Sequence, residues 1–208
     1  MDDKITTQWK DNKICLGMNI PRHYTGMMPK RDDIFSSALK LLVERGEQAT
    51  SMKLIAQEAG CGIGTMYNYF PSKEDLLNRL YLRIKTEGIE QILNGLDSKM
   101  PVKQQFTQAW LNAIRYALSD PYKHKFIEAY GHSPIIDADV SIKIMSMLQP
   151  IVAMFEKGIA EGIIKDMDIL QLVVFTQGGI NASLMQQPEI DKKGIDIIIQ
   201  MAWDAVKQ

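Results

Sequence analysis

The sequence predicts an all-α protein, because its apolar residues recur at helical spacing and no segment alternates in the manner of a β-strand. Ile34, Ala38 and Leu42, for example, repeat every fourth residue and so lie on one face of a helix. No segment carries the turn residues that punctuate β-hairpins. The β-branched run 195–199 is the one ambiguous stretch, and its flanking residues favour a helix.

The composition is that of a soluble globular protein with a net charge of −1 and 46% hydrophobic residues. The 208 residues suffice for one large domain or two small ones. Two cysteines, far apart in the chain, are typical of a reducing compartment. No run reaches the length of a membrane span, and the N-terminus lacks the apolar core of a secretory signal. We therefore predict a cytoplasmic protein without a membrane partner.

Residues 51–77 predict two short helices joined by a glycine turn, followed by a longer third helix. Ser51 is a suitable N-cap, and Gly60 stands where a helix end needs a left-handed residue. Pro71 ends the second helix, and Ser72 with Asp75 forms a capping-box pattern for the third. This is the layout of a helix-turn-helix, whose second helix enters the DNA major groove.

The second short helix should bury one side and expose the other. Met66 and Phe70 or Tyr69 would face inward, and the outward residues would contact DNA. The alternative is a solvated helix face with one buried tyrosine. Residues 30–78 hold six basic and seven acidic residues, which counts against DNA binding, but residues 60–72 include no acid that would repel phosphate. The outward residues are Ile63, Gly64, Thr65, Tyr67 and Asn68.

Further helices are expected along the rest of the chain. Pro150 should either kink or divide the one that contains it. The expected ranges are 31–45, 72–94, 102–117, 122–130, 142–159, 168–185 and 195–206.

Residues 30–77 resemble the DNA-binding domain of the TetR family of bacterial transcriptional regulators. The specific part is the run 64–76, in which aromatic residues, a lysine and acids occur in the family's order. The remaining residues match only in being helical and of suitable length. The resemblance implies a helix-turn-helix domain at 29–78 and a helical ligand-binding and dimerisation domain at 79–208. Residues 1–28 would be a flexible extension or, alternatively, a basic arm along the DNA.

The resemblance also implies roles on double-stranded operator DNA. Tyr67 and Lys73 would anchor phosphates, whereas Asn68 suits bidentate contact with adenine. Gly64 would let the backbone approach the DNA closely, and Ser51 could meet a phosphate at a helix N-terminus. The full predicted set is Lys30, Arg31, Ser51, Ile63, Gly64, Thr65, Tyr67, Asn68, Tyr69 and Lys73.

A pocket for a small, largely apolar inducer is implied at the centre of the C-terminal bundle. Thirteen methionines suit an adaptable interior of this kind. The apolar candidates can equally be plain core residues, whereas Tyr116, Tyr130 and Asn181 could orient a ligand. The predicted set is Phe106, Trp110, Ile114, Tyr116, Phe126, Tyr130, Met147, Ile151, Met154, Phe175 and Asn181.

The last two long helices are the family's dimer interface, where two protomers form a four-helix bundle. Adjacent glycines inside the first of these helices cost about 1 kcal/mol each relative to alanine, which indicates close packing. Packing within one chain alone is the alternative. The predicted interface comprises Phe175, Gly178, Gly179, Ala182, Met185, Ile198, Met201 and Ala202.

Catalysis, metal and cofactor binding find no support in the sequence. The glycine-rich run 60–65 follows a helix rather than a strand and lacks the lysine of a phosphate-binding loop. The three histidines are scattered, without a cysteine pair or an acid cluster. The resemblance to the TetR family leads us to expect a homodimeric repressor that its inducer releases from a palindromic operator. The alternative is a helical small-molecule binding protein without specific DNA binding.

Overall fold

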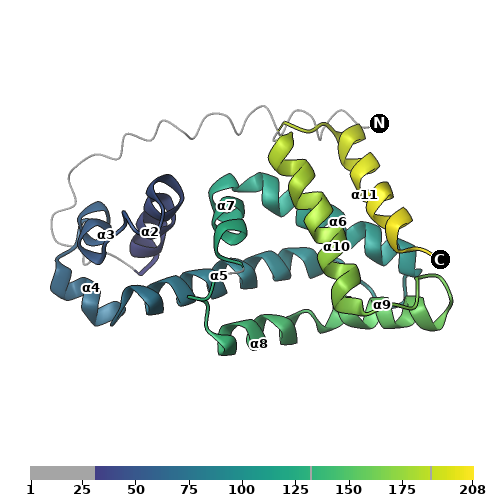
Figure 1. Cartoon of the computed structure of the whole chain (residues 1–208), viewed down its shortest axis with the longest axis horizontal. Coiled ribbons are helices and arrows are strands. Elements are labelled where there is room, and N and C mark those ends of the chain that lie inside the picture. The colour runs from purple at the N-terminus through teal and green to yellow at the C-terminus, as the bar shows by residue number, and fades with distance from the viewer. Residues whose placement is uncertain (1–30, 132, 188) are drawn as a thin grey trace.

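The computed structural model describes residues 31–131, 133–187 and 189–208, which form ten helices and no β-strand (Figure 1). The all-α prediction is confirmed for this part of the chain, while residues 1–28 and Lys30 lie outside it. The helices are α2 (Arg31–Arg45), α3 (Met52–Glu58), α4 (Ile63–Tyr69), α5 (Lys73–Leu93), α6 (Val102–Ser119), α7 (Pro121–Tyr130), α8 (Ala138–Met147), α9 (Gln149–Ala160), α10 (Ile169–Gln186) and α11 (Lys192–Val206).

Local signals in the sequence set most helix ends. The Ser51 hydroxyl accepts a hydrogen bond from the Leu54 amide at 3.2 Å, and Gly60 has a φ of +69°, as a left-handed helix end requires. Ser72 accepts one from the Asp75 amide at 3.1 Å. The predicted capping box is only half formed, because one Asp75 carboxylate oxygen pairs with Arg79 and the other has no partner among the described residues.

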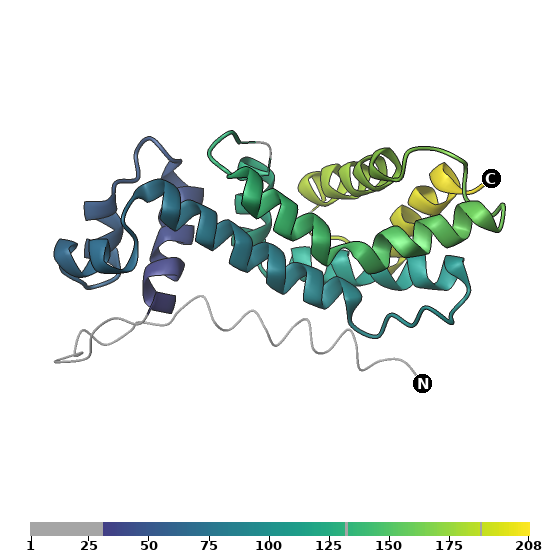
Figure 2. The ribbon, with the colours of Figure 1, turned by 90° about the horizontal axis from the view of Figure 1, so that it is seen from below.

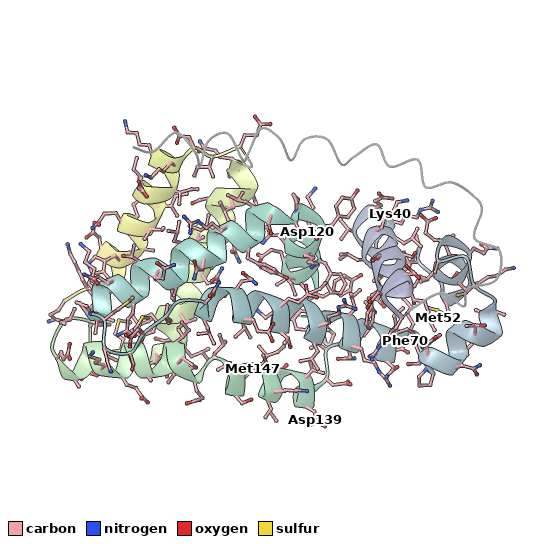
Figure 3. The ribbon with its side chains drawn as sticks, turned by 180° about the vertical axis from the view of Figure 1, so that it is seen from behind. Lys40, Met52, Phe70, Asp120, Asp139 and Met147 are labelled. Atoms are coloured by element: carbon pink, nitrogen blue, oxygen red, sulfur yellow. The ribbon has the colours of Figure 1, made fainter. Side chains whose placement is uncertain are left out.

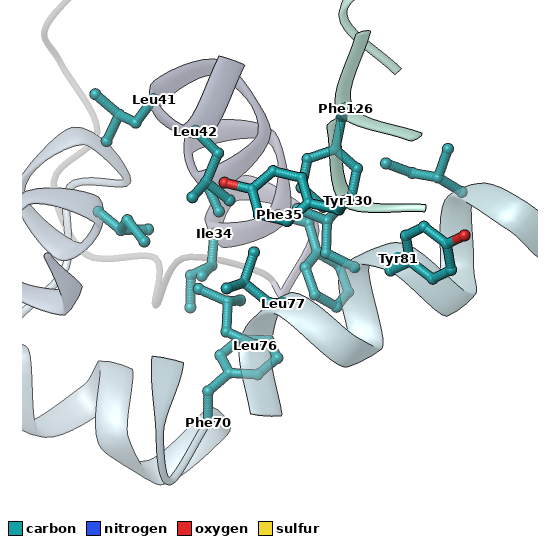
Figure 4. Packing of buried hydrophobic residues seen from close by; sticks show 14 of the residues in the cluster. Ile34, Phe35, Leu41, Leu42, Phe70, Leu76, Leu77, Tyr81, Phe126 and Tyr130 are labelled. Carbon is teal, nitrogen blue, oxygen red and sulfur yellow. The ribbon is translucent and has the colours of Figure 1, made fainter. Parts of the chain in front are cut away.

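Helices α2, α3 and α4, hereafter the head, share one hydrophobic core with α5 and α7 (Figure 4). Phe35 on α2 packs against Phe70 at a ring-centroid distance of 5.2 Å. Phe126 and Tyr130 of α7 pack against each other at 4.7 Å and close the same core from the other side. Helix α2 is therefore held between α5 and α7.

Helix α5 runs from the head into the rest of the molecule without interruption (Figure 2). The boundary predicted after residue 78 falls inside this helix, and residues on both sides of it belong to the shared core. That boundary remains a prediction about function rather than a break in the chain. Seen from behind, Met52 and Phe70 lie in the head, and Met147 lies at the end of α8 (Figure 3).

A second core joins α6, α9, α10 and α11. Phe106 stacks on Trp110 with ring centroids 4.5 Å apart and meets Trp203 edge-on at 5.2 Å. Gly158 on α9 lets Ile164 pack closely, because a Cβ atom there would lie 2.5 Å from an Ile164 methyl group. Two backbone hydrogen bonds hold the C-terminal end of the chain: the Lys165 amide donates to the Val206 carbonyl, and the Gln208 amide donates to the Ile163 carbonyl.

Pro150 divides the helix expected over 142–159. The first part, α8, already begins at Ala138, and α9 begins at Gln149 with the proline in its first turn, where a missing amide is harmless. The two axes differ by 57°. Among the described residues no single helix is long and apolar enough to cross a membrane, although α8 and α9 together meet that test by length and composition.

Asn78, on α5, is a buried polar residue that fixes the segment between α7 and α8. Its side-chain amide donates to the Ile135 carbonyl at 2.8 Å, and its side-chain oxygen accepts from the Asp137 amide, also at 2.8 Å. The side chain is thus satisfied on both its donor and its acceptor side. The sequence offered no sign of this role, because the partners lie 57 and 59 residues away.

We predict that Asn78→Ala lowers the free energy of unfolding by about 2–3 kcal/mol, since it leaves a backbone carbonyl and a backbone amide without partners. Urea denaturation measures this. Asn68→Ala, an exposed asparagine on α4, is the control and should change stability by less than about 0.5 kcal/mol. Equal midpoints for the two variants would contradict the role of Asn78.

Candidate nucleic-acid interface

Helix α4 presents one buried and one exposed side, as the sequence predicts. Met66 and Phe70 are fully buried, which anchors the helix to the head. On the opposite side Ile63 is 44% and Tyr67 51% exposed, although both are large hydrophobic or aromatic side chains. Large apolar groups left in water on a short helix are typical of a contact surface.

A glycine and a backbone hydrogen bond define the turn between α3 and α4. Gly60 adopts its positive φ, and the Cys61 amide donates to the Ala56 carbonyl at 2.9 Å, which closes the end of α3. Helix α4 then begins at Ile63 with Gly62 as its N-cap, without a side-chain capping bond. The N-terminal amides of α4 are consequently available to an external acceptor.

Gly64 lies on the exposed side of α4, and nothing in the described part of its own chain requires a glycine there. A Cβ atom at this position would meet no atom within 4 Å. The space beside the backbone is open at this position, which would let a partner such as DNA approach α4 closely. The other exposed residues are uncharged, so α4 offers phosphate no repulsion.

Lys73 and Ser51 flank α4 but already have partners within the chain. The Lys73 ammonium donates to the Glu47 carbonyl at 2.5 Å and lies 3.8 Å from the Glu47 carboxylate. A lysine has three donors, so Lys73 can keep this carbonyl and still offer a proton to phosphate. The Ser51 oxygen caps α3, while its hydroxyl proton is left to donate.

A cluster of arginines surrounds the aromatic residues at the end of α4. The Arg31 guanidinium lies 5.2 Å from the Phe35 ring centroid and 5.8 Å from that of Phe70, and the Arg79 guanidinium also lies 5.8 Å from the Phe70 centroid. Arginine stacks well on such rings. Sequence reasoning included Arg31 but missed Arg79, because a turn and two helical turns separate it from Phe70 in the chain.

The acids of the head are largely used in structural pairs. Glu58 pairs with Lys40 at 2.7 Å, and Glu47 pairs with Lys73. Glu44 accepts a hydrogen bond from the Tyr122 hydroxyl of α7 at 2.9 Å, and Asp32 pairs with Arg83 of α5. The balanced charge of the head thus reflects in part its attachment to α5 and α7, and α4 itself carries no acidic residue.

The predicted ligand residues do not converge on one site. Phe126, Tyr130 and Met147 belong to the core shared with the head, and Tyr130 is buried enough to raise its pKa to about 12. The central position expected of Phe175 is wrong, since this side chain is 69% exposed on the outside of α10. The remaining apolar members, buried in the second core, are Phe106, Trp110, Ile114, Ile151 and Met154.

The polar candidates occupy two different places. Tyr116 donates to the Ile84 carbonyl at 3.1 Å and lies against Gly88, where a Cβ atom would stand 2.9 Å from its ring. It lines an open groove of about 620 Å³ between α5, α6 and α7, together with Glu87, Arg115 and Lys123 among others. Asn181 instead lies on α10 and donates to Glu128 of α7 at 2.6 Å.

Most of the predicted dimer residues lie on one exposed apolar face of α10 and α11. Met185 and Met201 are each 65% exposed, and Phe175 lies on the same side of α10 as Met185 by helical spacing. A Cβ atom added to Gly178 or Gly179 would have no neighbour within 4 Å, so no packing within the described part of the chain explains these glycines. Ala182 is exposed as well, whereas Ile198 is half-buried and Ala202 is buried.

Comparison with known proteins agrees with this geometry. Residues 34–80 match the family described as bacterial regulatory proteins, tetR family, and residues 101–207 match the tetracyclin repressor-like C-terminal domain. The second match alone covers half of the chain. This protein belongs to the TetR family. It is accordingly a helix-turn-helix transcriptional regulator, and α4 is the second helix of that motif, the expected recognition helix.

The similarity of this TetR-family chain to individual relatives extends over most of its length. The HTH-type transcriptional regulator YhgD of Bacillus subtilis is 24% identical over 81% of this chain and 91% of its own. A TetR-family regulator structure from Shewanella sp. PV-4 has a TM-score of 0.77 and is 29% identical. The match covers 85% of this chain and 97% of that structure. FadR from Bacillus subtilis, solved in complex with stearoyl-CoA, shares the fold with a TM-score of 0.66 at 19% identity. This match covers 84% of the present chain and 96% of FadR.

We predict that Gly64→Ala weakens DNA binding roughly tenfold, because the added methyl group stands between the backbone of α4 and the DNA. Stability should stay equal or rise by up to about 1 kcal/mol, since alanine is the better helix former. Fluorescence anisotropy and thermal unfolding measure the two effects. A variant that unfolds earlier, or binds DNA as tightly as before, would contradict this account of Gly64.

Proposed function

We propose that this TetR-family regulator is a homodimeric repressor that leaves a palindromic operator when a small, largely apolar ligand binds. The exposed apolar face of α10 and α11 carries the dimer part of the proposal. A twofold axis through that face would place the two α4 helices in successive major grooves, about 34 Å apart. The protein would act where the DNA is, in the cytoplasm, and the role needs no catalytic group.

The paired glycines strengthen the case for a dimer. Each costs about 1 kcal/mol in a helix, and nothing in the described part of its own chain offsets that cost. A second copy packed closely against Gly178 and Gly179 would do so, as small residues do where helices approach closely. Phe175 and Met185 would then be covered as well.

Helix α7 supports the proposed response to ligand. Its Tyr122 hydroxyl bonds Glu44 on α2, and its Phe126 and Tyr130 pack into the core of the head. Its other side faces the bundle, where Glu128 bonds Asn181 of α10. A ligand that prefers a shifted α7 by a few kcal/mol would change the spacing of the two heads and so weaken DNA binding.

An apolar ligand fits the composition of the bundle. Phe106, Trp110 and Met154 are among the buried residues of the second core, and Trp110 keeps a buried indole N–H without a partner in the described residues. FadR shows that a protein of this fold can hold a long acyl chain. The alternative, a small-molecule binding protein without specific DNA binding, is favoured only by the balanced charge of the head.

Fluorescence anisotropy with the DNA that flanks its own gene tests the DNA part. We expect tight binding that weakens as salt rises, because bound phosphates release counterions. An unrelated duplex is the control and should bind far more weakly. Tyr67→Ala should lose roughly tenfold in affinity for the flanking DNA. Equal binding to both duplexes at every salt concentration would favour the alternative function.

Phe175→Glu tests the dimer. The side chain is already 69% exposed in one chain, so the variant should fold normally but sediment as a monomer. Ile142→Glu on α8, equally exposed at 67%, is the matched control and should remain dimeric. Analytical ultracentrifugation distinguishes them. If Phe175→Glu keeps the mass of the wild-type protein, the interface lies elsewhere.

A further inference from the structure

Polar side chains from three helices lie near Glu128 of α7. Lys85 lies on α5, His124 and Glu128 lie one turn apart on α7, and Gln177 and Asn181 lie one turn apart on α10. Gln177 donates to Asn181 at 2.8 Å, and Asn181 donates to Glu128 at 2.6 Å. The Asn181–Glu128 hydrogen bond therefore ties α7 to α10, and Lys85 and His124 lie within electrostatic range of the same carboxylate.

Lys85 is exceptional among the lysines of the described residues. Five of them are half-buried, and four of these have an acceptor: Lys73 has Glu47, Lys123 has Glu87, Lys157 has the Ser98 carbonyl and Lys165 has the Ala205 carbonyl. Of these five half-buried lysines, only Lys85 has neither a side-chain hydrogen bond nor an ion pair in the described residues. Its ammonium nitrogen is not one of the fully buried polar atoms that lack a partner, so this cation is accessible to an acceptor from outside the described residues.

His124 adds a second unsatisfied group. Its Nε2 atom is buried and has no hydrogen-bond partner in the described residues. Burial lowers the pKa of His124, which keeps the ring neutral and able to carry a proton on either nitrogen. Buried polar atoms are almost always satisfied, so an exception requires an explanation.

Glu128 lies within electrostatic range of both groups. Burial lowers the pKa of Lys85, and the negative charge of Glu128 partly opposes that shift. Glu128 acts on the pKa of His124 in the same sense. Yet Glu128 is no ion-pair partner of Lys85, and its bonded oxygen is directed to Asn181. The Lys85 ammonium and the Glu128 carboxylate are therefore near each other without being in direct contact.

We propose that Lys85 and His124 bind the acyl oxygen of the regulator's ligand, a carboxylate or an ester-type carbonyl at one end of an apolar chain. This rests on the proposed function, whose ligand it describes more closely. An oxygen with two lone pairs can accept from both Lys85 and His124, whereas a cationic ligand has no acceptor for either. The adjoining cores supply apolar contacts for the chain.

The position of Glu128 gives this site a means of regulation. A carboxylate bound by Lys85 stands near the Glu128 carboxylate and repels it, which weakens the Glu128–Asn181 hydrogen bond between α7 and α10. An uncharged carbonyl exerts no such repulsion. Carboxylic acids should therefore disturb α7 more strongly than esters of the same chain length.

Isothermal titration calorimetry of the full chain with decanoate, methyl decanoate and decylamine tests the proposal. Lys85→Met keeps the apolar stem but removes the donors, and should weaken decanoate binding roughly tenfold to a hundredfold. Lys125→Met, an exposed lysine of α7, removes the same charge and should bind decanoate as the wild type does. Decylamine should bind neither variant nor the wild type.

Glu128→Gln distinguishes the two sources of the oxygen. It should tighten decanoate binding and leave methyl decanoate unchanged if the acid is the ligand; tighter methyl decanoate than decanoate in the wild type would assign the ester. Lys85→Met should also raise the melting temperature, because it removes an unpaired half-buried charge. A fall in melting temperature would instead show that Lys85 is structural.

Anisotropy with operator DNA separates this proposal from the proposed function. Lys85→Met should bind the DNA like the wild type but resist release by decanoate. If the wild type fails to bind DNA, the proposed function falls while the calorimetry still decides the site. If decanoate and methyl decanoate both fail to bind the wild type, or bind Lys85→Met equally well, the proposed site is overturned.

Discussion

The packing of α2 between α5 and α7 is the contact on which the rest of the structure depends. Phe35, Phe126 and Tyr130 bring together segments nearly a hundred residues apart, and their burial stabilises the head and the bundle at once. Because α5 is continuous, the orientation of α4 follows from this packing. A change in α7 cannot remain local, since close-packed interiors shift between discrete arrangements rather than deform freely.

The charged residues of α2 serve to attach the head to its neighbours, and α4 carries no charge of its own. Asp32 and Glu44 bind Arg83 and Tyr122, which fastens α2 to its neighbours. The expected recognition helix itself is left uncharged, with arginines beside its end. A balanced net charge in the head is therefore compatible with DNA binding, because what matters to phosphate is the local distribution of charge rather than the sum.

Sequence reasoning was accurate where the signal was local. Gly60, Ser51 and Ser72 mark helix ends through their own backbone or hydroxyl chemistry, and the structure confirms each. It was incomplete where two outcomes had equal support, as at Pro150, which divides the helix rather than kinking it. It failed for the ligand-binding role of Phe175, because an apolar residue on an apolar helix carries no mark of which side is covered, while the dimer role of the same residue stays a prediction.

The sequence by itself determined the helices, the glycine turn and the outward side of α4, since these depend on residues within one or two turns of each other. Only the tertiary structure decided that α7 clamps α2, that Asn78 holds a segment almost sixty residues away, and that Lys85 stands without a partner among the described residues. Helical periodicity reports which residues share a face. Which faces meet is settled by the packing of whole helices, and that information is spread over the entire chain.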